Sequence, residues 1–257
     1  MIRAYLQYLL KARNEHSLHS PFVFDLYTQV IRRDNPGEPA FEPIRTLRKE
    51  LLKETRRIRI TDFGAGSRVN TARDRSIRDI ARNSEKPARF GRLMARLIRH
   101  FGSEIIFDLG TSLGVTTLYE AVAAPKSRII TFEGCPQTAA EAGKNFRNLR
   151  CENIRIIVGN LDETLVREIG RTDRIDFAFF DANHRLEPTV RYFETCLGKA
   201  HNESCFVFDD IHWSGEMEAA WAAIKAHPDV TVTIDLFYIG LVFFRKQQPK
   251  QDFVLRF

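Results

Sequence analysis

The sequence predicts an α/β fold in which helices cover both faces of a mostly parallel β-sheet. From residue 104 onward, short apolar runs alternate with helix-like stretches, a pattern typical of strands that are buried on both faces. These runs are residues 104–110, 127–134, 153–160, 174–183 and 204–210. Residues 230–246 instead contain two apolar stretches joined by a short turn, which predicts an antiparallel hairpin at the sheet's edge. In total, the pattern predicts seven strands.

The part of the chain before residue 104 predicts helices and one short basic strand. Residues 1–55 are expected to be helical, with Ser20 as the N-cap and Pro21 as the first residue of one helix. Residues 56–64 predict the basic strand. Pro87 then opens an amphipathic helix, because apolar residues follow it at helical spacing. We therefore divide the chain into an N-terminal helical, basic extension (1–87) and a second domain (88–257).

The composition is that of an ordinary globular protein. Of the 257 residues, 44% are apolar and 28% are charged, and no apolar run approaches the roughly 20 residues that cross a membrane. The first residues lack a small-residue cleavage site, so we expect no signal peptide. Four cysteines without CxxC or metal-ligand spacing favour reduced thiols in the cytoplasm. Nothing in the sequence decides between a monomer and a homodimer.

The charge is distributed unevenly along the chain. The first hundred residues hold 22 Lys or Arg against 11 Asp or Glu, whereas residues 101–257 hold 17 against 22. A basic segment joined to a mildly acidic domain suggests an anionic substrate or partner near the N-terminal part. The alternative is that these arginines lie on solvated helix faces.

Two glycine-rich stretches compete for the role of a cofactor loop. Both "DFGAGS" (residues 62–67) and "DLGTSLG" (residues 108–114) follow an apolar strand. A cofactor loop should be followed by a second strand that ends in an acid able to bind ribose hydroxyls. Only the second loop meets this condition, because Glu133 ends the strand "RIITFE". We therefore expect residues 108–114 to bind the cofactor.

The spacing of the second loop indicates which cofactor it binds. Gly110 and Gly114 form GxxxG, which matches neither the GxGxxG of nicotinamide-binding folds nor a phosphate-binding P-loop. With this loop, Glu133, the alternation of strands and helices, and the terminal hairpin, residues 88–246 resemble class I S-adenosylmethionine-dependent methyltransferases, which have a Rossmann-like fold. The resemblance implies that the glycines admit the amino-acid part of S-adenosylmethionine. It places Asp108 near the ammonium group and Glu133 on the ribose.

The same resemblance extends the expected cofactor site to further residues. Asn160 and Leu161 would flank the adenine, and Asp162 would meet its amino group; the alternative is that Asp162 caps the next helix. The cofactor-binding residues expected in full are Asp108, Gly110, Thr111, Ser112, Gly114, Thr116, Glu133, Gly134, Asn160, Leu161, Asp162 and Asp181.

The acceptor side is expected at the carboxyl ends of the fourth and fifth parallel strands. Asp181 ends one of them, with His184 three residues later, and Asp209 and Asp210 end the other. Three carboxylates from neighbouring strand ends could hold a hard cation such as Mg²⁺. Such an ion would bind a substrate hydroxyl and lower its pKa. The alternatives are that these acids orient a ligand or cap a helix.

These acids sharpen the resemblance toward metal-dependent O-methyltransferases of the catechol type. The resemblance implies that Asp181, Asp209 and Asp210 hold Mg²⁺ or another divalent cation. It also implies that His184 is the general base, acting with Asp181. His184 stands where catechol-type enzymes have lysine, and Asp210 stands where they have asparagine, so the catechol substrate does not carry over. The whole chain, from "HSPFVFDL" to "DDIHW", resembles an uncharacterised bacterial branch of this superfamily.

Three functions follow from this reading. The first is O-methylation of a small molecule, in which the "DFGAGS" stretch would form a lid or contact the substrate; the alternative is a plain turn that only packs the extension. The second is methylation of RNA or another polyanion held by the basic extension, although the chain has "DANH" where an NPPY-type motif marks methylation of base amino groups. The third is a non-catalytic scaffold that binds S-adenosylmethionine.

Overall fold

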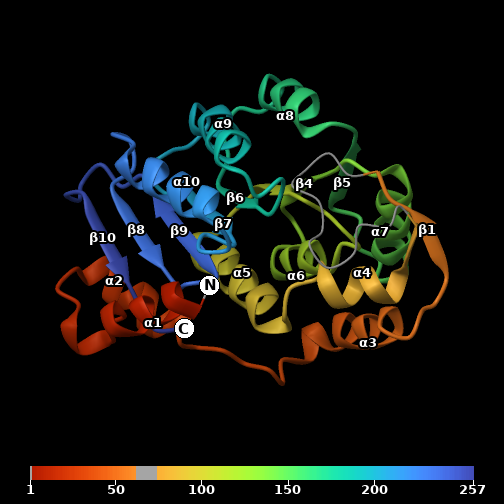
Figure 1. The fold of residues 1–257 in the computed structure, drawn as a ribbon, viewed down its shortest axis with the longest axis horizontal. Coiled ribbons are helices and arrows are strands. Elements are labelled where there is room, and N and C mark those ends of the chain that lie inside the picture. Colours follow the sequence, from red (N-terminus) through yellow and green to blue (C-terminus); the bar gives the residue numbers. More distant parts are fainter. Residues whose placement is uncertain (1, 62–73) are drawn as a thin grey trace.

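A computed structural model describes residues 2–61 and 74–257 of the chain. Among them is one large sheet, with the strand order β10-β8-β9-β7-β6-β3-β4-β5 (Figure 1). In chain order its strands are β3 (Ile105–Leu109), β4 (Arg128–Glu133), β5 (Ile154–Val158), β6 (Phe177–Phe180), β7 (Cys205–Asp209), β8 (Val232–Asp235), β9 (Ile239–Phe243) and β10 (Gln251–Val254). The α/β class and the mostly parallel sheet are confirmed.

The sheet has one more strand than the sequence predicted. The hairpin of β8 and β9 is antiparallel, as expected, and β9 pairs antiparallel with β7. Strand β10 then pairs parallel with β8, so the described sheet has eight strands and the hairpin does not lie at its edge. The prediction of seven strands was wrong because β10 has only four residues, two of them exposed and polar, and follows the polar residues 247–250.

Helices cover both faces of the sheet, as the buried strands required. On one face lie α8 (Leu161–Ile169), α9 (Leu186–Leu197) and α10 (Gly215–Ala226). On the other lie α5 (Ala88–Phe101), α6 (Val115–Ala123) and α7 (Pro136–Asn148). The apolar residues that predicted the helix after Pro87 are inside: Phe90, Leu93, Met94, Leu97 and Ile98 are buried. The carboxyl ends of β3, β4 and β6 therefore open between these two helical layers.

The N-terminal extension lies along the sheet and contacts both of its ends. Its helices α1 (Ile2–Lys11) and α2 (Pro21–Leu26) lie near the hairpin and β10, whereas α3 (Glu42–Leu51) and α4 (Ile77–Asn83) lie near α6 and α7 (Figure 1). Its remaining elements are three short turns of helix, Glu15–Ser17, Tyr27–Ile31 and Pro39–Phe41, and the two-stranded sheet of β1 (Arg57–Arg59) and β2 (Asp74–Ser76). Ser20 caps α2 as predicted, since its hydroxyl accepts the Val23 N–H. The "DFGAGS" stretch lies outside the described residues.

Candidate active site

The predicted cofactor loop joins β3 to α6 in a conformation that requires glycine. Gly110 has φ of 121° and Gly114 has φ of 81°, values that L side chains rarely adopt. A Cβ on Gly110 would lie 2.2 Å from the carbonyl oxygen of Asp181. A Cβ on Gly114 would lie 2.4 Å from the Phe146 ring. Both glycines thus permit a close approach, and Gly110 brings the loop directly against the end of β6.

Glu133 lies beside this loop, at the end of β4. Its carboxylate accepts the Ser112 N–H and the Cys135 N–H, each at 2.9 Å. Gly134 lies between Glu133 and Cys135 in the chain. Thr116 is partly exposed in the first turn of α6. The predicted loop and the predicted ribose-binding acid therefore lie together at one edge of the sheet.

Asp108 is buried beneath the loop. Its Oδ2 accepts the hydroxyls of Thr117 (2.5 Å) and Thr131 (2.9 Å), and Thr131 in turn contacts the Thr111 hydroxyl at 2.5 Å. Burial raises the pKa of Asp108 to about 7 against the effect of these hydrogen bonds. The sequence reading missed Thr117 and Thr131, because threonines in a helix and in a strand carry no motif of their own.

The third predicted segment, residues 160–162, follows β5 at the same edge of the sheet. Its hydrogen bonds differ from those of the alternative in which Asp162 caps the next helix. Asn160, and not Asp162, caps α8, because the Asn160 side chain accepts the Asp162 N–H at 3.1 Å. The Asp162 carboxylate accepts from Arg191 and from the Tyr192 hydroxyl, each at 2.7 Å. Leu161 begins the helix and is partly buried. The alternative, in which Asp162 caps the helix, is therefore wrong, and the adenine contacts of Asn160, Leu161 and Asp162 stay a prediction.

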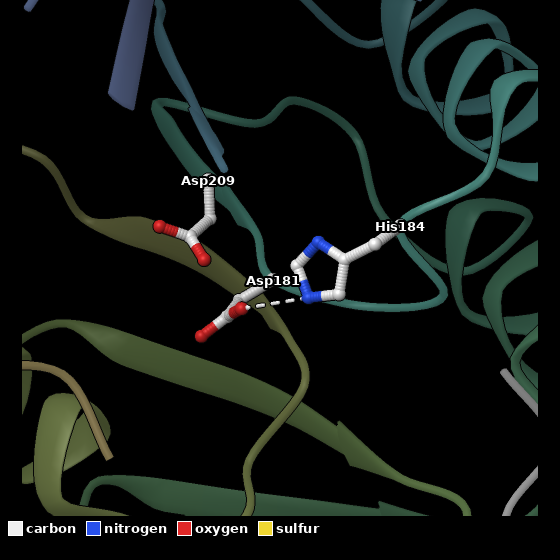
Figure 2. Close-up of side chains that lie close together, drawn as sticks. All are labelled: Asp181, His184 and Asp209. Carbon is white, nitrogen blue, oxygen red and sulfur yellow. Dashed lines mark ion pairs between the residues drawn. The ribbon is translucent and has the colours of Figure 1, made fainter. Parts of the chain in front are cut away.

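Asp181 and His184 form a pair beside Asp209 (Figure 2). His184 Nε2 lies 3.3 Å from Asp181 Oδ1, and one ligand atom from each of the three side chains lies within 4.8 Å of the others. Asn183 and His184 have φ of 68° and 41°, left-handed values that are strained for non-glycine residues and often found at functional sites. The turn after β6 thus holds the imidazole over Asp181.

The ionisation of this cluster is set by burial and by neighbouring charges. Burial and the negative charge of Asp181 raise the pKa of Asp209 to about 7, although Lys86 and His184 oppose this. Burial raises the pKa of Asp210 as well, helped by Asp209. Burial disfavours the charged imidazole, but the hydrogen bond and charge of Asp181 outweigh it and raise the pKa of His184.

Lys86 is a residue of the cluster that the sequence reading missed. It lies just before α5, and its Nζ makes an ion pair with Asp209 Oδ2 and lies 3.2 Å from Asp210 Oδ1. The preceding residue, Glu85, is buried and accepts the Leu113 N–H of the cofactor loop at 2.9 Å. A lysine before a helix-opening proline was the visible signal, but the sequence did not show that its partners are more than 120 residues away.

The lysine bears on the predicted metal. Asp181 and Asp209 do come together, as the metal prediction required, with His184 as the third potential ligand. Asp210 instead faces the Lys86 ammonium, which also contacts Asp209. Mg²⁺, the predicted ion, takes six ligands, mostly oxygens, and is held by the negative charge of its carboxylates. With Lys86 in this position, the described residues do not fit a metal held by Asp181, Asp209 and Asp210.

A small pocket adjoins the cluster. It is lined by Asp210, His212, Trp213, Phe237 and Tyr238. The Trp213 ring lies 5.9 Å from the His184 ring, centroid to centroid, which places the pocket next to the Asp181–His184 pair. His212 stacks on Phe237 at 5.3 Å and contacts Asp235 Oδ2 at 2.7 Å. The walls of the pocket are thus largely aromatic.

Comparison with known proteins agrees with this geometry. Residues 107–211, from the glycine loop through the acidic pair, match a family model described as a methyltransferase domain. The chain has the class I methyltransferase fold. Among curated proteins, no sequence matches this chain.

Solved structures of several methyltransferases share this fold at low sequence identity. One is the methyltransferase PaMTH1 of Podospora anserina bound to S-adenosylhomocysteine (14% identity, TM-score 0.63, covering 89% of this chain and 98% of that one). A second is an O-methyltransferase of Bacillus cereus in complex with S-adenosylhomocysteine (16%, TM-score 0.55, 86% and 97%). A third is the O-methyltransferase TomG of Streptomyces achromogenes, involved in tomaymycin synthesis and in complex with S-adenosylmethionine (19%, TM-score 0.55, 63% and 82%).

Two further findings concern membrane spans and the charge of the basic extension. Within residues 2–61 and 74–257, no helix is long and apolar enough to span a membrane. Several arginines of the basic extension and of α5 are ion-paired inside the chain. Arg92 and Arg96 pair with Asp34, Arg99 with Glu38, and Arg56 with Glu141. Part of the basic charge is therefore matched by acids of the same molecule.

Proposed function

We propose that this chain transfers the methyl group of S-adenosylmethionine to a hydroxyl oxygen of a small molecule. The observation that carries the proposal is the contact between Gly110 and Asp181. It joins the loop expected to bind the methyl donor to the pair of side chains able to accept a proton. The neighbouring structures that hold S-adenosylmethionine or S-adenosylhomocysteine support the choice of donor.

The reaction asks little of the protein beyond alignment and proton transfer. S-adenosylmethionine supplies a methyl carbon already activated by its sulfonium. The acceptor oxygen attacks that carbon while the carbon–sulfur bond breaks and its electrons go to sulfur. In our proposal, His184 Nδ1 takes the hydroxyl proton, because Nε2 faces Asp181 on the other side of the ring (Figure 2). Asp181 orients the ring and stabilises the imidazolium that forms.

The proposed acceptor is a flat hydroxylated molecule. The pocket beside His184 has Trp213, Phe237 and Tyr238 in its lining, and aromatic walls favour stacking of a ring with its hydroxyl toward the imidazole. The ion-paired arginines favour a small molecule over a polyanion, since they have less free charge to offer phosphates. We further propose a cytoplasmic enzyme, in keeping with four free cysteines.

A titration with S-adenosylhomocysteine, followed by calorimetry, tests the donor site first. We expect saturable binding at one site for the wild type. Glu133→Gln should weaken it by about 2 kcal/mol, or about 30-fold, because it removes charged hydrogen bonds to the ribose. Glu152→Gln, at an exposed position, is the matched control and should bind as the wild type does. Absence of binding in the wild type would remove the proposal and favour another role for the fold.

Turnover tests the acceptor side. The protein is incubated with S-adenosylmethionine carrying a labelled methyl group and a panel of phenols, hydroxy acids and bulk RNA. Label on a phenolic oxygen is the expected result. Label on RNA alone would instead favour the polyanion function, and binding without any transfer would favour the scaffold. Repeating the binding titration with Mg²⁺ and with EDTA tests the predicted metal separately.

A further inference from the structure

The acid cluster at the ends of β6 and β7 carries its own counter-charge. Asp209 is fully buried, and Asp210 and Asp181 are largely buried beside it. Carboxylates so placed are costly unless a positive group or hydrogen bonds compensate them. The Lys86 ammonium provides that charge, because it pairs with Asp209 and Asp210 together. The ammonium therefore lies where Asp209 and Asp210, two of the three predicted metal ligands, would direct their oxygens.

The backbone around Lys86 is held so that its ammonium stays in this position. The Arg48 guanidinium donates to the carbonyl oxygens of Lys86 (2.6 Å) and Glu85 (3.3 Å). Glu85 in turn accepts the Leu113 N–H of the cofactor loop. Pro87, with its fixed φ, then starts α5. Lys86 therefore extends from a segment anchored on both sides and does not belong to a free surface chain.

We propose that the Lys86 ammonium is the resident cation of this cluster, so that the site works without a divalent metal ion. The ammonium makes an ion pair with Asp209 and donates a hydrogen bond to Asp210 Oδ1 at 3.2 Å. Its point charge also repels a second cation. Lys86 thus acts as a positioning residue that fixes the carboxylates beside His184.

The test measures metal binding, which needs no known acceptor. Mn²⁺ is titrated into the protein and the signal of the free ion is followed by electron paramagnetic resonance. We expect no saturable site in the wild type and one site in Lys86→Ala, where the carboxylates lose their ammonium and gain space. The double variant Lys86→Ala/Asp209→Asn is the matched control and should lose the site again. A lysine with a purely structural role would not create a metal site when it is removed.

Two outcomes would overturn the proposal. One is a saturable Mn²⁺ site in the wild type that Asp209→Asn abolishes, because the cluster then holds a metal despite the lysine. The other is a folded Lys86→Ala that binds no Mn²⁺, because the ammonium then does not stand in a cation position.

A second variant guards against loss of folding. If Lys86→Ala does not fold, Lys86→Gln takes its place, and Mn²⁺ should raise its unfolding temperature but not that of the wild type. Failure of Mn²⁺ to stabilise folded Lys86→Gln would count against the proposal. If neither variant folds, the wild-type titration decides alone: an Asp209-dependent site refutes the proposal, and its absence supports it.

The catalytic meaning of this inference rests on the proposed function, but its test does not. Each variant is also titrated with S-adenosylhomocysteine. If the wild type does not bind S-adenosylhomocysteine, the methyltransferase proposal is wrong, but the conclusion from the Mn²⁺ titration is unaffected. Retained binding together with a wild-type metal site would remove only the proposal about Lys86.

Discussion

Gly110 is the point at which the proposed donor loop and the proposed acceptor side of the site meet. Its Cα faces the carbonyl group of Asp181, and the Asp181 N–H donates to the Leu109 carbonyl oxygen at 2.8 Å. Adjacent parallel strands therefore continue their pairing one residue beyond their ends. The distance between the loop and the Asp181–His184 pair is thus fixed by backbone atoms and does not depend on any side-chain rotamer.

Substitution of Gly110 should damage the site through this contact. Gly110→Ala places a Cβ 2.2 Å from a carbonyl oxygen at φ of 121°, so we expect a loss of about 1–3 kcal/mol in the free energy of unfolding. Affinity for S-adenosylhomocysteine should fall as well. Gly198→Ala is the control, because its Cβ would meet nothing within 4 Å and its φ is −61°. Denaturant unfolding and calorimetry measure both; equal effects of the two substitutions would contradict the steric argument.

His184 should affect turnover far more than donor binding. In His184→Gln a side chain of similar reach can still contact Asp181, but it cannot take a proton. We expect turnover to fall by about 10²–10⁴-fold, the usual contribution of a general base, with little change in affinity for S-adenosylhomocysteine. Transfer of labelled methyl to the acceptor found in the panel measures turnover, and calorimetry measures the affinity for S-adenosylhomocysteine. Unchanged turnover would exclude His184 as the base.

At the scale of elements, Asp34 connects the turn after the helical segment Tyr27–Ile31 to helix α5. Its carboxylate accepts two hydrogen bonds from Arg92, both at 2.7 Å, and pairs with Arg96 at 2.9 Å. The hydrogen bond from Arg92 holds the pKa of Asp34 below its ordinary value of 3.8. These contacts secure the extension on the helix that begins just after Lys86.

This lowered pKa predicts how stability depends on pH. The stabilisation by Asp34 should be present above pH of about 4, the pKa of an unfolded aspartate, and lost as the pH falls through the lower pKa of the folded state. Wild type should therefore exceed Asp34→Asn in free energy of unfolding at pH 7, and the difference should shrink toward pH 3. Urea unfolding across this range measures it. Asp173→Asn, at an exposed position, is the control; a difference for Asp34→Asn that is constant with pH would contradict the ion-pair explanation.

Over the whole molecule, the first helix and the last strand support each other. The Tyr8 hydroxyl donates to the Leu255 carbonyl oxygen at 2.6 Å in a buried contact, and the Arg13 N–H donates to Val254 at 2.8 Å. Both ends of the chain lie at the same side of the sheet (Figure 1). Stability of the β10 edge therefore depends on residues far away in the sequence.

Removing the Tyr8 hydroxyl should lower the stability of the whole chain. Tyr8→Phe keeps the ring but removes the hydroxyl that donates to the Leu255 carbonyl oxygen. We therefore expect the free energy of unfolding to fall by about 1 kcal/mol. In a chain of this size, that lowers the unfolding temperature by about 2–4 °C. Tyr5→Phe, in the same helix but with a partly exposed side chain, should have little effect. Calorimetric scans of the three proteins measure this, and matching losses would show that the Leu255 contact is not responsible.

Local pattern was sufficient for the core of the fold but not for its long-range contacts. The apolar runs that end in Asp108, Glu133, Asp181 and Asp209 predicted both the strands and the edge at which these acids meet. Strand β10 was not predicted, because it is a strand through its pairing with β8 and not through an apolar run. The contacts of Lys86 were not predicted for a related reason: an ion pair produces no periodic pattern in the sequence of either segment that forms it.

The pairing of Lys86 with Asp209 and Asp210 also limits how such a chain can change over generations. If the lysine is replaced first, the carboxylates of Asp209 and Asp210 lose their ammonium partner. If one of the acids is replaced first, the largely buried ammonium loses one of its two carboxylate partners. Either single step is harmful, whereas a paired replacement, or the recruitment of an outside ion, is tolerated. These positions should therefore be inherited as a unit, although one belongs to the extension and the others to the sheet.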